Sequence, residues 1–566
     1  MAIESLITDH LDLWTAAVRP KSSAGRGSNS KQELTGIKKL RELILELAVR
    51  GKLVPQDPSD EPASVLLERI AAEKAQLIRE GKIKSEKQYP VISDTELPHS
   101  KPDGWVFERF GNVLINRDFE RIPLAVSERE KRKGGYDYYG ASGVIDKIDG
   151  YLFDKPLLLI GEDGANLINR SSPIAFIARG KYWVNNHAHV LDGLNEDLLK
   201  YVCLHINAMS LLPYITGTAQ PKMNQAKMNA IVLGIPPLAE QKRIVAKVDE
   251  LMALCDKLEQ RSDSQLAAHQ TLVETLLATL TDCVDADELA QNWARLSTHF
   301  DTLFTTERSI DALKQTILQL AVMGKLVPQD PSDEPASALL ERIAAEKAQM
   351  VKEKKIKKEK PLPAISEDEK PFELPQGWEW ARLGNIGICS TGKTPSTGNS
   401  AFYDGEIPFI GPGQITPSGK LLAAEKYLSD VGLELSSEAN AGDILMVCIG
   451  GSIGKSTICD RQIGFNQQIN SIRPILCDSY FLLAAMTTKA FTNLLLERAT
   501  GSATPIINRS KWEEIPIPMS PYQEQLRIIS RVHELMALCD QLKSRLQTSQ
   551  QTQLALAESL VEGALA

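Results

Sequence analysis

The chain has 566 residues, of which 43% are hydrophobic and 24% charged, and a formal net charge of −9 at pH 7. At about 100 to 200 residues per domain, this length allows roughly three to five domains, and the composition excludes fibrous and disordered classes. No apolar run approaches the ~20 residues of a membrane helix. The first ten residues lack the basic and apolar regions of a secretory signal, so we expect a cytoplasmic protein with no membrane contact.

The eight cysteines are scattered, and no two of them form a Cys-x-x-Cys pair. We therefore expect neither a zinc site nor a disulfide framework, and predict no metal in this chain. The net negative charge argues against a protein that coats nucleic acid by bulk charge. Local basic grooves remain compatible with it, because affinity for phosphates depends on where Lys and Arg lie.

The most informative feature of the sequence is an internal repeat. Residues 47–76 return as residues 320–349, at an offset of 273, with 28 of 30 positions identical. A second block, 250–256, returns as 534–540 at an offset of 284, so the second copy is 11 residues longer between the blocks. This agreement excludes chance and predicts a duplicated fold.

Each copy is predicted to begin with a helical scaffold. Residues 62–80 and 335–355 are rich in Ala, Leu, Glu and Lys and follow a stretch of prolines and acids that suits a first helical turn. A Ser/Gly-rich stretch at about residues 21–31 is expected to be a flexible linker.

A long helix is also predicted in each copy, from about 240 to 280 and from about 521 to 562. Both carry apolar residues at spacings of 4, 3, 4 and 3, which is the seam of a coiled coil. The seam residues are Ile244, Val248, Leu251, Cys255 and Leu258 in the first helix and Ile528, Val532, Leu535, Cys539 and Leu542 in the second. We expect the two helices to pair as an antiparallel coiled coil that acts as a spacer.

Two middle regions differ in character from these helical parts. They are rich in Gly, aromatic and β-branched residues, with short apolar runs bounded by Gly, which predicts mixed sheets with many loops. The expected fold is α+β, with two mixed α/β domains in a duplicated chain. The expected segments are a scaffold at 1–104, a middle domain at 105–235, a long helix at 236–282, a second scaffold at 283–377, a second middle domain at 378–518 and a final long helix at 519–566.

The middle regions barely match each other, although the scaffolds are nearly identical. Sparse matches pair Ile160-Gly161 with Ile449-Gly450. Two equal scaffolds suit two copies of one partner, whereas two different middle regions suit two different ligands. The alternative is a recent duplication whose middle regions drifted without function.

Residues 387–394 fit the phosphate-loop pattern G-x-x-x-x-G-K-[ST]. That loop needs a buried strand before it and a helix N-terminus after it, which holds the phosphate. Residues 381–386 form no apolar run, and Pro395 follows the motif at once. We therefore predict no ATP site, and expect Lys393 to contact nucleic-acid phosphate or to pack structurally.

Basic, hydroxyl and aromatic side chains in the loops of the middle regions are the candidate DNA contacts, because they can bind phosphates and base edges. They are Arg117, Arg121, Lys131, Arg132, Lys133, Tyr138, Ser142 and Lys222 in the first region and Lys393, Thr394, Ser396, Tyr403, Lys455 and Ser502 in the second. Taken alone, such a run is usually a solvated loop. His187 and His189 are expected to be core or surface residues, because no Cys or acid accompanies them at ligand spacing.

Sequence signatures of catalysis are missing. The chain has no G-x-S-x-G, no H-E-x-x-H, no dinucleotide fingerprint and no Asn-Pro-Pro-Tyr-like tetrapeptide of amino-methyltransferases. We expect no catalytic residue in this chain and favour a binding protein.

The layout resembles that of the DNA specificity subunits of Type I restriction-modification enzymes, over essentially the whole chain. The resemblance rests on the duplicated scaffold, the Gly-Trp-x-[FW] motifs at 104–107 and 377–380, the turns at 160–164 and 449–452, the Asn-Gln-Gln-Ile motif at 466–469, and the Pro-containing stretches at 235–241 and 517–521. The extended N-terminal helical region departs from shorter members, which leaves its docking role open.

This resemblance implies two target recognition domains that each read one half of a split double-stranded DNA sequence. It also implies docking of two methyltransferase subunits, with restriction/translocation subunits joining in the full complex. S-adenosylmethionine, ATP and Mg²⁺ are then expected in the partner subunits, with no cofactor in this chain. The alternative is an enzyme with two unrecognised small-molecule sites in its middle domains.

Overall fold

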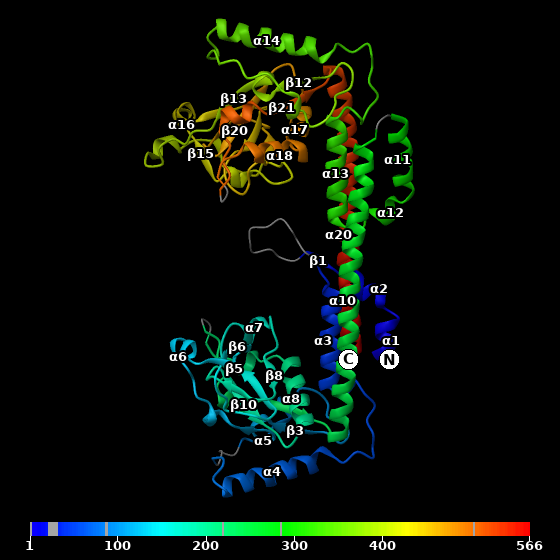
Figure 1. The fold of residues 1–566 in the computed structure, drawn as a ribbon, viewed down its shortest axis with the longest axis vertical. Helices are drawn as coiled ribbons and strands as arrows, with labels where there is room; N and C mark the ends of the chain where they lie inside the picture. Colours follow the sequence, from blue (N-terminus) through cyan, green and yellow to red (C-terminus); the bar gives the residue numbers. More distant parts are fainter. Residues whose placement is uncertain are drawn as a thin grey trace. The chain divides into compact units, whose positions relative to one another are not determined.

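Figure 1 shows the computed structural model of the chain, which describes residues 3–20, 32–84, 89–217, 220–283, 286–501 and 504–565. The chain divides into two compact units. No helix among the described residues is long and apolar enough to cross a bilayer. The linker predicted at residues 21–31 lies outside the described residues.

The first unit comprises the described residues up to 264 together with residues 550–565. Its helical part contains α1 (Ile3–Thr8), α2 (Leu11–Ala16), α3 (Thr35–Val49), α4 (Ala63–Arg79), the start of α10 (Leu238–Thr281) and the end of α20 (Tyr522–Leu565), with the strand pair β1 (Arg19–Pro20) and β2 (Gln32–Glu33). The predicted helix at 62–80 is confirmed as α4, which ends just before Gly81 in the left-handed region at φ 69°.

The sheet part of the first unit contains three sheets. They are the antiparallel pair β3 (Val106–Arg109) and β11 (Val232–Ile235), the four-stranded sheet in the order β4 (Ile115–Asn116), β10 (Ala188–Asp192), β7 (Leu157–Gly161) and β8 (Ala175–Ala178), and the three-stranded sheet in the order β6 (Gly143–Ile148), β5 (Lys133–Gly140) and β9 (Tyr182–Val184). The helices between them are η1 (Asp94–Glu96), α5 (Phe110–Val113), η2 (Asp118–Glu120), α6 (Val126–Lys131), α7 (Asn166–Asn169), α8 (Glu196–Ala208), η3 (Leu212–Tyr214) and α9 (Gln225–Asn229). Strand β7 is buried throughout, as expected for an apolar run in the middle of a sheet.

The second unit comprises the described residues from 265 to 549. Its helices are the end of α10, α11 (Ala286–Thr298), α12 (Phe300–Leu303), α13 (Glu307–Val322), α14 (Ala336–Lys352), η4 (Glu367–Glu369), α15 (Leu383–Ile386), η5 (Ser400–Phe402), η6 (Pro412–Gln414), α16 (Asp430–Leu435), α17 (Ser479–Met486), α18 (Lys489–Arg498), α19 (Arg509–Glu513) and the start of α20. Its sheets are the pair β12 (Glu379–Arg382) and β21 (Pro516–Met519), the order β13 (Gly387–Thr391), β20 (Ile469–Pro474), β17 (Ile444–Val447) and β18 (Ser456–Ile458), and the order β15 (Lys426–Leu428), β14 (Ile407–Ile410), β19 (Ile463–Phe465) and β16 (Ser437–Ala439).

The sheet parts of the two units follow one topology. The four-stranded sheets correspond strand by strand, and the parallel pair β5–β9 of the first unit has its counterpart in β14–β19 of the second. The second unit adds β16 at the edge of that sheet. The predicted mixed fold, with two sheet-containing domains and long helices, is therefore confirmed.

One pairing expected from the sequence is wrong. The sequence aligns residues 185–189 with 466–470, so His189 corresponds to Asn470. In the sheets His189 lies opposite Ile160, and Asn470 lies opposite Met446, so Ile160 corresponds to Met446 and not to Ile449. The turn after the strand shows the same shift. The Gly164 amide donates to the Pro221 carbonyl at 3.0 Å, and the Gly450 amide donates to the Pro505 carbonyl at 2.8 Å. The Ile-Gly dipeptides at 160–161 and 449–450 are therefore not equivalent, and the alignment based on them is wrong by three residues.

Equivalent hydrogen bonds tie each sheet part to its long helix. The indole nitrogen of Trp105 donates to the Glu240 carboxylate at 3.1 Å near the start of α10. The indole nitrogen of Trp378 donates to Glu524 at 2.9 Å near the start of α20. Burial raises the pKa of both carboxyl groups, although the indole donors oppose that shift. The Gly-Trp motifs thus anchor the starts of strands β3 and β12 to the long helices α10 and α20.

The seam residues of α10 and α20 are buried or half-buried in the structure. In the second unit, the seam of α20 shares one apolar cluster with α13 and with the second half of α10. The helical members of this cluster include Val273, Leu277, Leu280, Ile310, Leu313, Ile317, Leu320, Ile528, Val532, Leu535 and Cys539. Lys543 of α20 also pairs with Asp311 of α13 at 3.0 Å. The heptad spacing did not reveal that the scaffold helix of the same copy packs on the seam.

Candidate nucleic-acid interface

Arg117, Arg121 and Lys222 come together around one acidic cluster in the first unit. Arg117 follows β4 and forms an ion pair with Asp192 at 2.6 Å. Arg121 and Lys222 both pair with Glu162, which follows β7, at 3.1 Å. These bonds fix the guanidinium groups and offset part of their charge, and the Lys222 side chain stays half exposed. Whether these three side chains contact DNA stays a prediction.

The core of the same cluster is the buried pair of Asp118 and His189. Nδ1 of His189 lies 2.6 Å from the Asp118 carboxylate, and Nε2 lies 3.0 Å from the carbonyl oxygen of Met223. Burial alone would raise the pKa of Asp118, but His189 and Arg121 outweigh burial and hold it below its ordinary value. Since both ring nitrogens face acceptors, His189 links β10 to η2 and to the loop that contains Met223, and it has a structural role.

The corresponding position in the second unit holds a neutral pair. Thr391 donates its hydroxyl hydrogen to Asn470 at 2.8 Å, where the first unit has Asp118 and His189. The same place in one topology thus carries charge in one unit and none in the other. Among the described residues, no three His, Cys, Asp or Glu side chains are grouped so as to hold a metal ion.

A second group of predicted residues lies on the three-stranded sheet of the first unit. Arg132 pairs with Asp149 at 2.9 Å and lies 4.9 Å from the ring centre of Trp183. Lys133 pairs with Asp146 at 2.6 Å and remains exposed. Lys131, at the end of α6, and Ser142, in the turn from β5 to β6, are exposed as well.

Tyr138, which the sequence suggested as a DNA contact, is not on the surface. Its side chain is fully buried, its hydroxyl accepts a hydrogen bond from the Leu124 amide at 3.1 Å, and Arg129 lies over its ring. Because β5 alternates its side chains between two faces, Tyr138 points into the core. It is a packing residue and not a surface contact.

The predicted residues of the second unit lie in loops beside β13 and β17. Lys393, Thr394 and Ser396 are exposed, and the hydroxyl of Tyr403 donates to the Pro395 carbonyl at 2.7 Å, which fixes this loop. Lys455 is half-buried in the turn from β17 to β18. Ser502 lies outside the described residues.

The geometry of residues 387–394 does not match a nucleotide-binding loop. Residues 387–391 form strand β13 itself, and no helix occurs between residues 392 and 399, all of which the structure describes. A Cβ on Gly392 would lie 1.9 Å from the carbonyl oxygen of Asn466, so glycine is required there by close backbone packing. The predicted absence of a helix after Lys393 is confirmed.

We expect the substitution Lys393→Ala to leave the ATP affinity of the assembled complex unchanged. DNA binding should weaken, with the slope of log affinity against log salt falling by about one unit for the loss of one phosphate contact. Titration of labelled duplexes over a range of salt concentrations measures this slope. Tight ATP binding by the isolated chain that is lost on substitution would restore the nucleotide-loop interpretation.

Exposed apolar side chains, which the sequence did not point to, lie near the same loops. They are Phe119, Ile122, Val126, Val144 and Ile145. Phe119 lies between Arg117 and Arg121 in the chain and is 58% exposed. Apolar side chains can contact the thymine methyl group in the major groove, so these residues join the candidates. In the sequence, the position of Phe119 between charged residues of a predicted loop was the feature that could have indicated its exposure.

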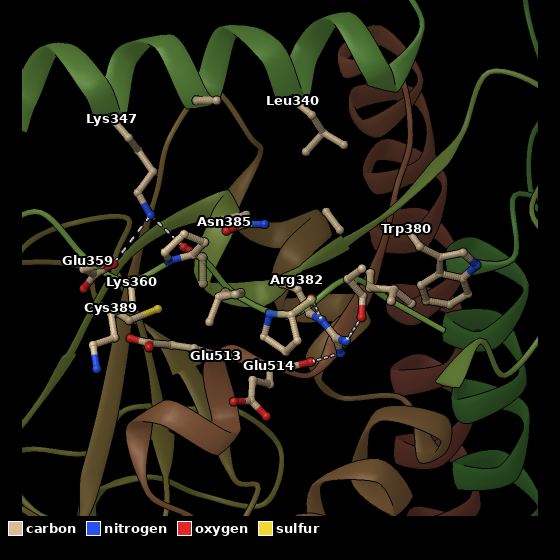
Figure 2. A pocket seen from close by; sticks show the side chains of 18 of the residues that line it. Leu340, Lys347, Glu359, Lys360, Trp380, Arg382, Asn385, Cys389, Glu513 and Glu514 are labelled. Atoms are coloured by element: carbon tan, nitrogen blue, oxygen red, sulfur yellow. Dashed lines mark hydrogen bonds and ion pairs between the residues drawn. The ribbon is translucent and has the colours of Figure 1, made fainter. Parts of the chain in front are cut away.

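The large open cleft of the second unit lies between α14 and the sheet domain, with a volume of about 2180 Å³ (Figure 2). Lys347 donates to the carbonyl oxygens of Gly384 at 2.7 Å and Gly387 at 2.9 Å. Arg382 binds Glu369 at 2.7 Å. Lys347 and Arg382 are thus held by the protein's own acceptors.

Comparison with known proteins identifies the family. The family model described as "Type I restriction modification DNA specificity domain" matches residues 102–268 and 375–549. The specificity subunits of the Type I restriction enzymes EcoAI and EcoEI, both from Escherichia coli, are 42% and 43% identical, and each alignment covers the whole of both chains. The solved HsdS subunit from Thermoanaerobacter tengcongensis is 15% identical, with 83% of this chain and 99% of that chain covered and a TM-score of 0.40.

The matched segments contain both sheet domains with their loops and the greater part of both long helices. Full-length identity above 40% to two such subunits covers the scaffolds as well. The chain belongs to the family of Type I restriction enzyme DNA specificity subunits.

Proposed function

We propose that each sheet domain of this specificity subunit reads one half of a bipartite DNA target. The observation that carries the proposal is the combination of one shared topology with different side chains at equivalent loop positions. The pair Asp118–His189 against the pair Thr391–Asn470 is an example. Two domains that read different base sequences need the same frame and different surfaces.

Charge supports the contact with DNA. Lys131, Lys133 and Lys222 in the first unit and Lys393 in the second keep exposed ammonium groups beside loops that carry hydroxyl and apolar side chains. Ammonium groups position a protein on phosphates, whereas hydroxyl and apolar groups read base edges. Because the net charge of the chain is −9, its attraction to phosphates must come from these local surfaces.

The chemistry of the complex would then reside in other subunits. The chain would dock two methyltransferase subunits through its scaffolds and, through the complex, the restriction/translocation subunits. Methyl transfer from S-adenosylmethionine and ATP- and Mg²⁺-dependent translocation and cleavage would belong to those partners. This chain would supply recognition and spacing, with no catalytic residue of its own.

We also propose the domain limits given by the sequence, with recognition domains at 105–235 and 378–518. The long helices would form an antiparallel coiled-coil spacer between them. Support for the spacer comes from α10 and α20, each of 44 residues, and from their buried apolar seams. Each helix has residues in both compact units.

A domain exchange tests the recognition proposal. Replacing residues 105–235 with the equivalent domain of a related subunit should change one half of the methylated sequence and leave the other half intact. Sequencing of methylated adenines in cells that carry the chimera and its partner subunits reads both halves at once. The reciprocal exchange of 378–518 is the matched control and should alter the opposite half. A chimera that changes both halves, or neither, would contradict modular reading.

A further inference from the structure

Two exposed side chains occupy equivalent places in the two sheet domains and differ in their chemistry. Lys222 of the first unit and Ile506 of the second each follow a proline and precede a buried residue, which is Met223 or Ile507. The side chain of Lys222 is 52% exposed, and Ile506 is 41% exposed. Each domain thus presents one side chain to solvent from the same point of its fold.

Backbone hydrogen bonds fix this place in the same way in both units. The amide of Lys222 donates to the Thr216 carbonyl at 2.8 Å and its carbonyl accepts from the Thr216 amide at 2.9 Å, whereas both bonds between Ile506 and Thr500 are 2.8 Å long. The flanking bonds run from Gly164 to Pro221 at 3.0 Å and from Met223 to Glu162 at 2.8 Å in the first unit, and from Gly450 to Pro505 at 2.8 Å and from Ile507 to Cys448 at 3.0 Å in the second. The two frames are therefore equal, and only the presented side chain differs.

In the first unit, a chain of charges that ends in the core holds the ammonium group of Lys222. Its Nζ lies 3.1 Å from the carboxylate of Glu162, which also binds Arg121 at 3.1 Å. Arg121 pairs with Asp118 at 3.4 Å, and Asp118 pairs with the buried His189 at 2.6 Å. A carboxylate occupies one of the three donors of an ammonium group, so Lys222 is held in place and can still donate to a ligand.

In the second unit, the corresponding positions are neutral. Cys448 stands where the first unit has Glu162, and the pair Thr391–Asn470 replaces the charged pair. Burial raises the pKa of the Cys448 thiol to about 11, so the thiol is uncharged at neutral pH. The apolar side chain of Ile506 thus has a neutral support, whereas the charged side chain of the first unit has a charged one.

A lysine that is paired with a carboxylate suits a base edge better than a phosphate. The negative charge of Glu162 beside Lys222 offsets the attraction on which a phosphate contact depends. A fixed ammonium donor matches the O6 and N7 acceptors of guanine in the major groove. The side chain of Ile506 has no donor, and it matches the methyl group of thymine.

We propose that Lys222 and Ile506 are specificity-determining residues: Lys222 reads a guanine in the half-site bound by residues 105–235, and Ile506 reads a thymine methyl group in the half-site bound by residues 378–518. Glu162 is a positioning residue for Lys222. The inference rests on the proposed function, which supplies the two half-sites. It goes further because it assigns one base contact to an equivalent residue in each domain.

The test uses the full chain produced together with its methyltransferase subunits, and duplexes that carry the methylated target sequence. In the first half-site, each guanine in turn is replaced by 7-deazaguanine, which lacks the N7 acceptor. We expect one of these replacements to lower the affinity of the unaltered chain about tenfold and to leave that of Lys222→Met unchanged. In the second half-site, each thymine in turn is replaced by deoxyuridine, which lacks the methyl group. One replacement should cost the unaltered chain about fourfold, as for one buried methyl group, and Ile506→Ala nothing.

Matched controls and a positioning variant accompany this series. Lys200→Met on α8 removes another ammonium that lies beside a carboxylate, that of Glu196 at 3.5 Å, and Leu496→Ala on α18 truncates another exposed apolar side chain. Both controls should respond to the base analogues as the unaltered chain does. Glu162→Gln should reduce the discrimination against 7-deazaguanine and steepen the salt dependence of binding, because it frees the charge of Lys222 for phosphate.

Three outcomes would overturn the inference. A Lys222→Met chain that binds all duplexes uniformly more weakly, with the salt slope lowered by about one unit, would make Lys222 a phosphate contact. Tolerance of every analogue by the unaltered chain, or equal losses on the unaltered chain and the variants, would remove both base contacts. A first half-site without a G·C pair would exclude the contact of Lys222. A complex that methylates no bipartite sequence would instead refute the proposed function itself.

Discussion

The substitution Arg382→Ala is expected to lower the free energy of unfolding of the second unit by about 1–3 kcal/mol, because it removes a buried donor shared by a partly buried carboxylate and by backbone carbonyls. Arg382 is buried, and its guanidinium binds Glu369 at 2.7 and 2.8 Å. The same group donates to the carbonyl oxygens of Pro363 at 2.9 Å and Ala364 at 2.7 Å. Without it, the two carbonyl oxygens lose this donor, and Glu369 keeps only its bonds with Arg498 and Ser366.

The loss should appear as one shifted transition in calorimetric unfolding of the full chain. A chain of two units need not unfold in a single step, so the transition of the first unit serves as an internal reference. The variant Arg382→Lys keeps the charge but loses the planar fork that binds Glu369 and the carbonyls together. It should recover only part of the loss. An Arg382→Ala chain that unfolds like the unaltered protein would contradict this account.

The first unit contains a matched control. Arg109 binds Glu96 at 2.8 Å and the Ala230 carbonyl at 2.9 Å in the corresponding place. The side chain of Glu96 is 41% exposed, whereas that of Glu369 is 23% exposed. More water around the carboxylate weakens the pair, so Arg109→Ala should cost less than Arg382→Ala.

The pH dependence of the same pair has a defined sign. The hydrogen bond from Arg382, with others from Ser366 and Arg498, lowers the pKa of Glu369 far below its ordinary value of 4.5, although desolvation opposes the shift. A carboxyl group whose pKa is lowered by folding stabilises the folded state at pH values above its ordinary pKa. This stabilisation is lost as the pH falls towards the lowered pKa. The advantage of the unaltered protein over Glu369→Gln should thus be full above about pH 5 and shrink steadily in more acidic solution.

The sequence predicted those features that depend on local pattern. The repeat, the helices α4 and α14, the long helices with their seams and the lack of a helix after Lys393 all follow from spacing and composition. Each is set by residues that are neighbours in the chain. Proline and glycine positions were sufficient to exclude the nucleotide loop.

The features that the sequence could not provide depend on residues far apart in the chain. Arg117 has its partner Asp192 75 residues away, so a basic residue in a loop gave no sign that it was already paired. Tyr138 lies on a strand whose inward face is decided by β9 and α6. The packing of α13 on the α20 seam joins segments more than 200 residues apart. Such contacts are set by tertiary packing.

We expect the gap between the two half-sites to follow the length of the long helices. At 1.5 Å per residue, each of the two 44-residue helices is about 66 Å long. If they form the proposed spacer, their length sets the distance between the recognition domains. We expect that inserting one heptad into both helices changes the preferred gap. The insertion points are 264/265 in α10 and 549/550 in α20, where each helix passes from one compact unit to the other.

A matched heptad preserves the seam and lengthens the spacer by about 10 Å, equivalent to about three base pairs at 3.4 Å each. Those base pairs also rotate the second half-site by about 100° around the duplex, at about 10 to 10.5 pairs per turn. Binding should therefore be weaker even at the best new gap. The measurement is the affinity for a series of duplexes whose gap grows by one base pair at a time.

A heptad inserted into α10 alone is the matched control, because it leaves the two helices unequal and should destabilise the chain without giving a new preferred gap. In the double insertion, a preference for longer gaps supports the spacer, as does loss of specific binding with both half-sites still recognised weakly. The spacer proposal fails if the folded double-insertion chain still prefers the original gap with undiminished affinity. In that case the distance between half-sites would have to be set by the partner subunits and not by these helices.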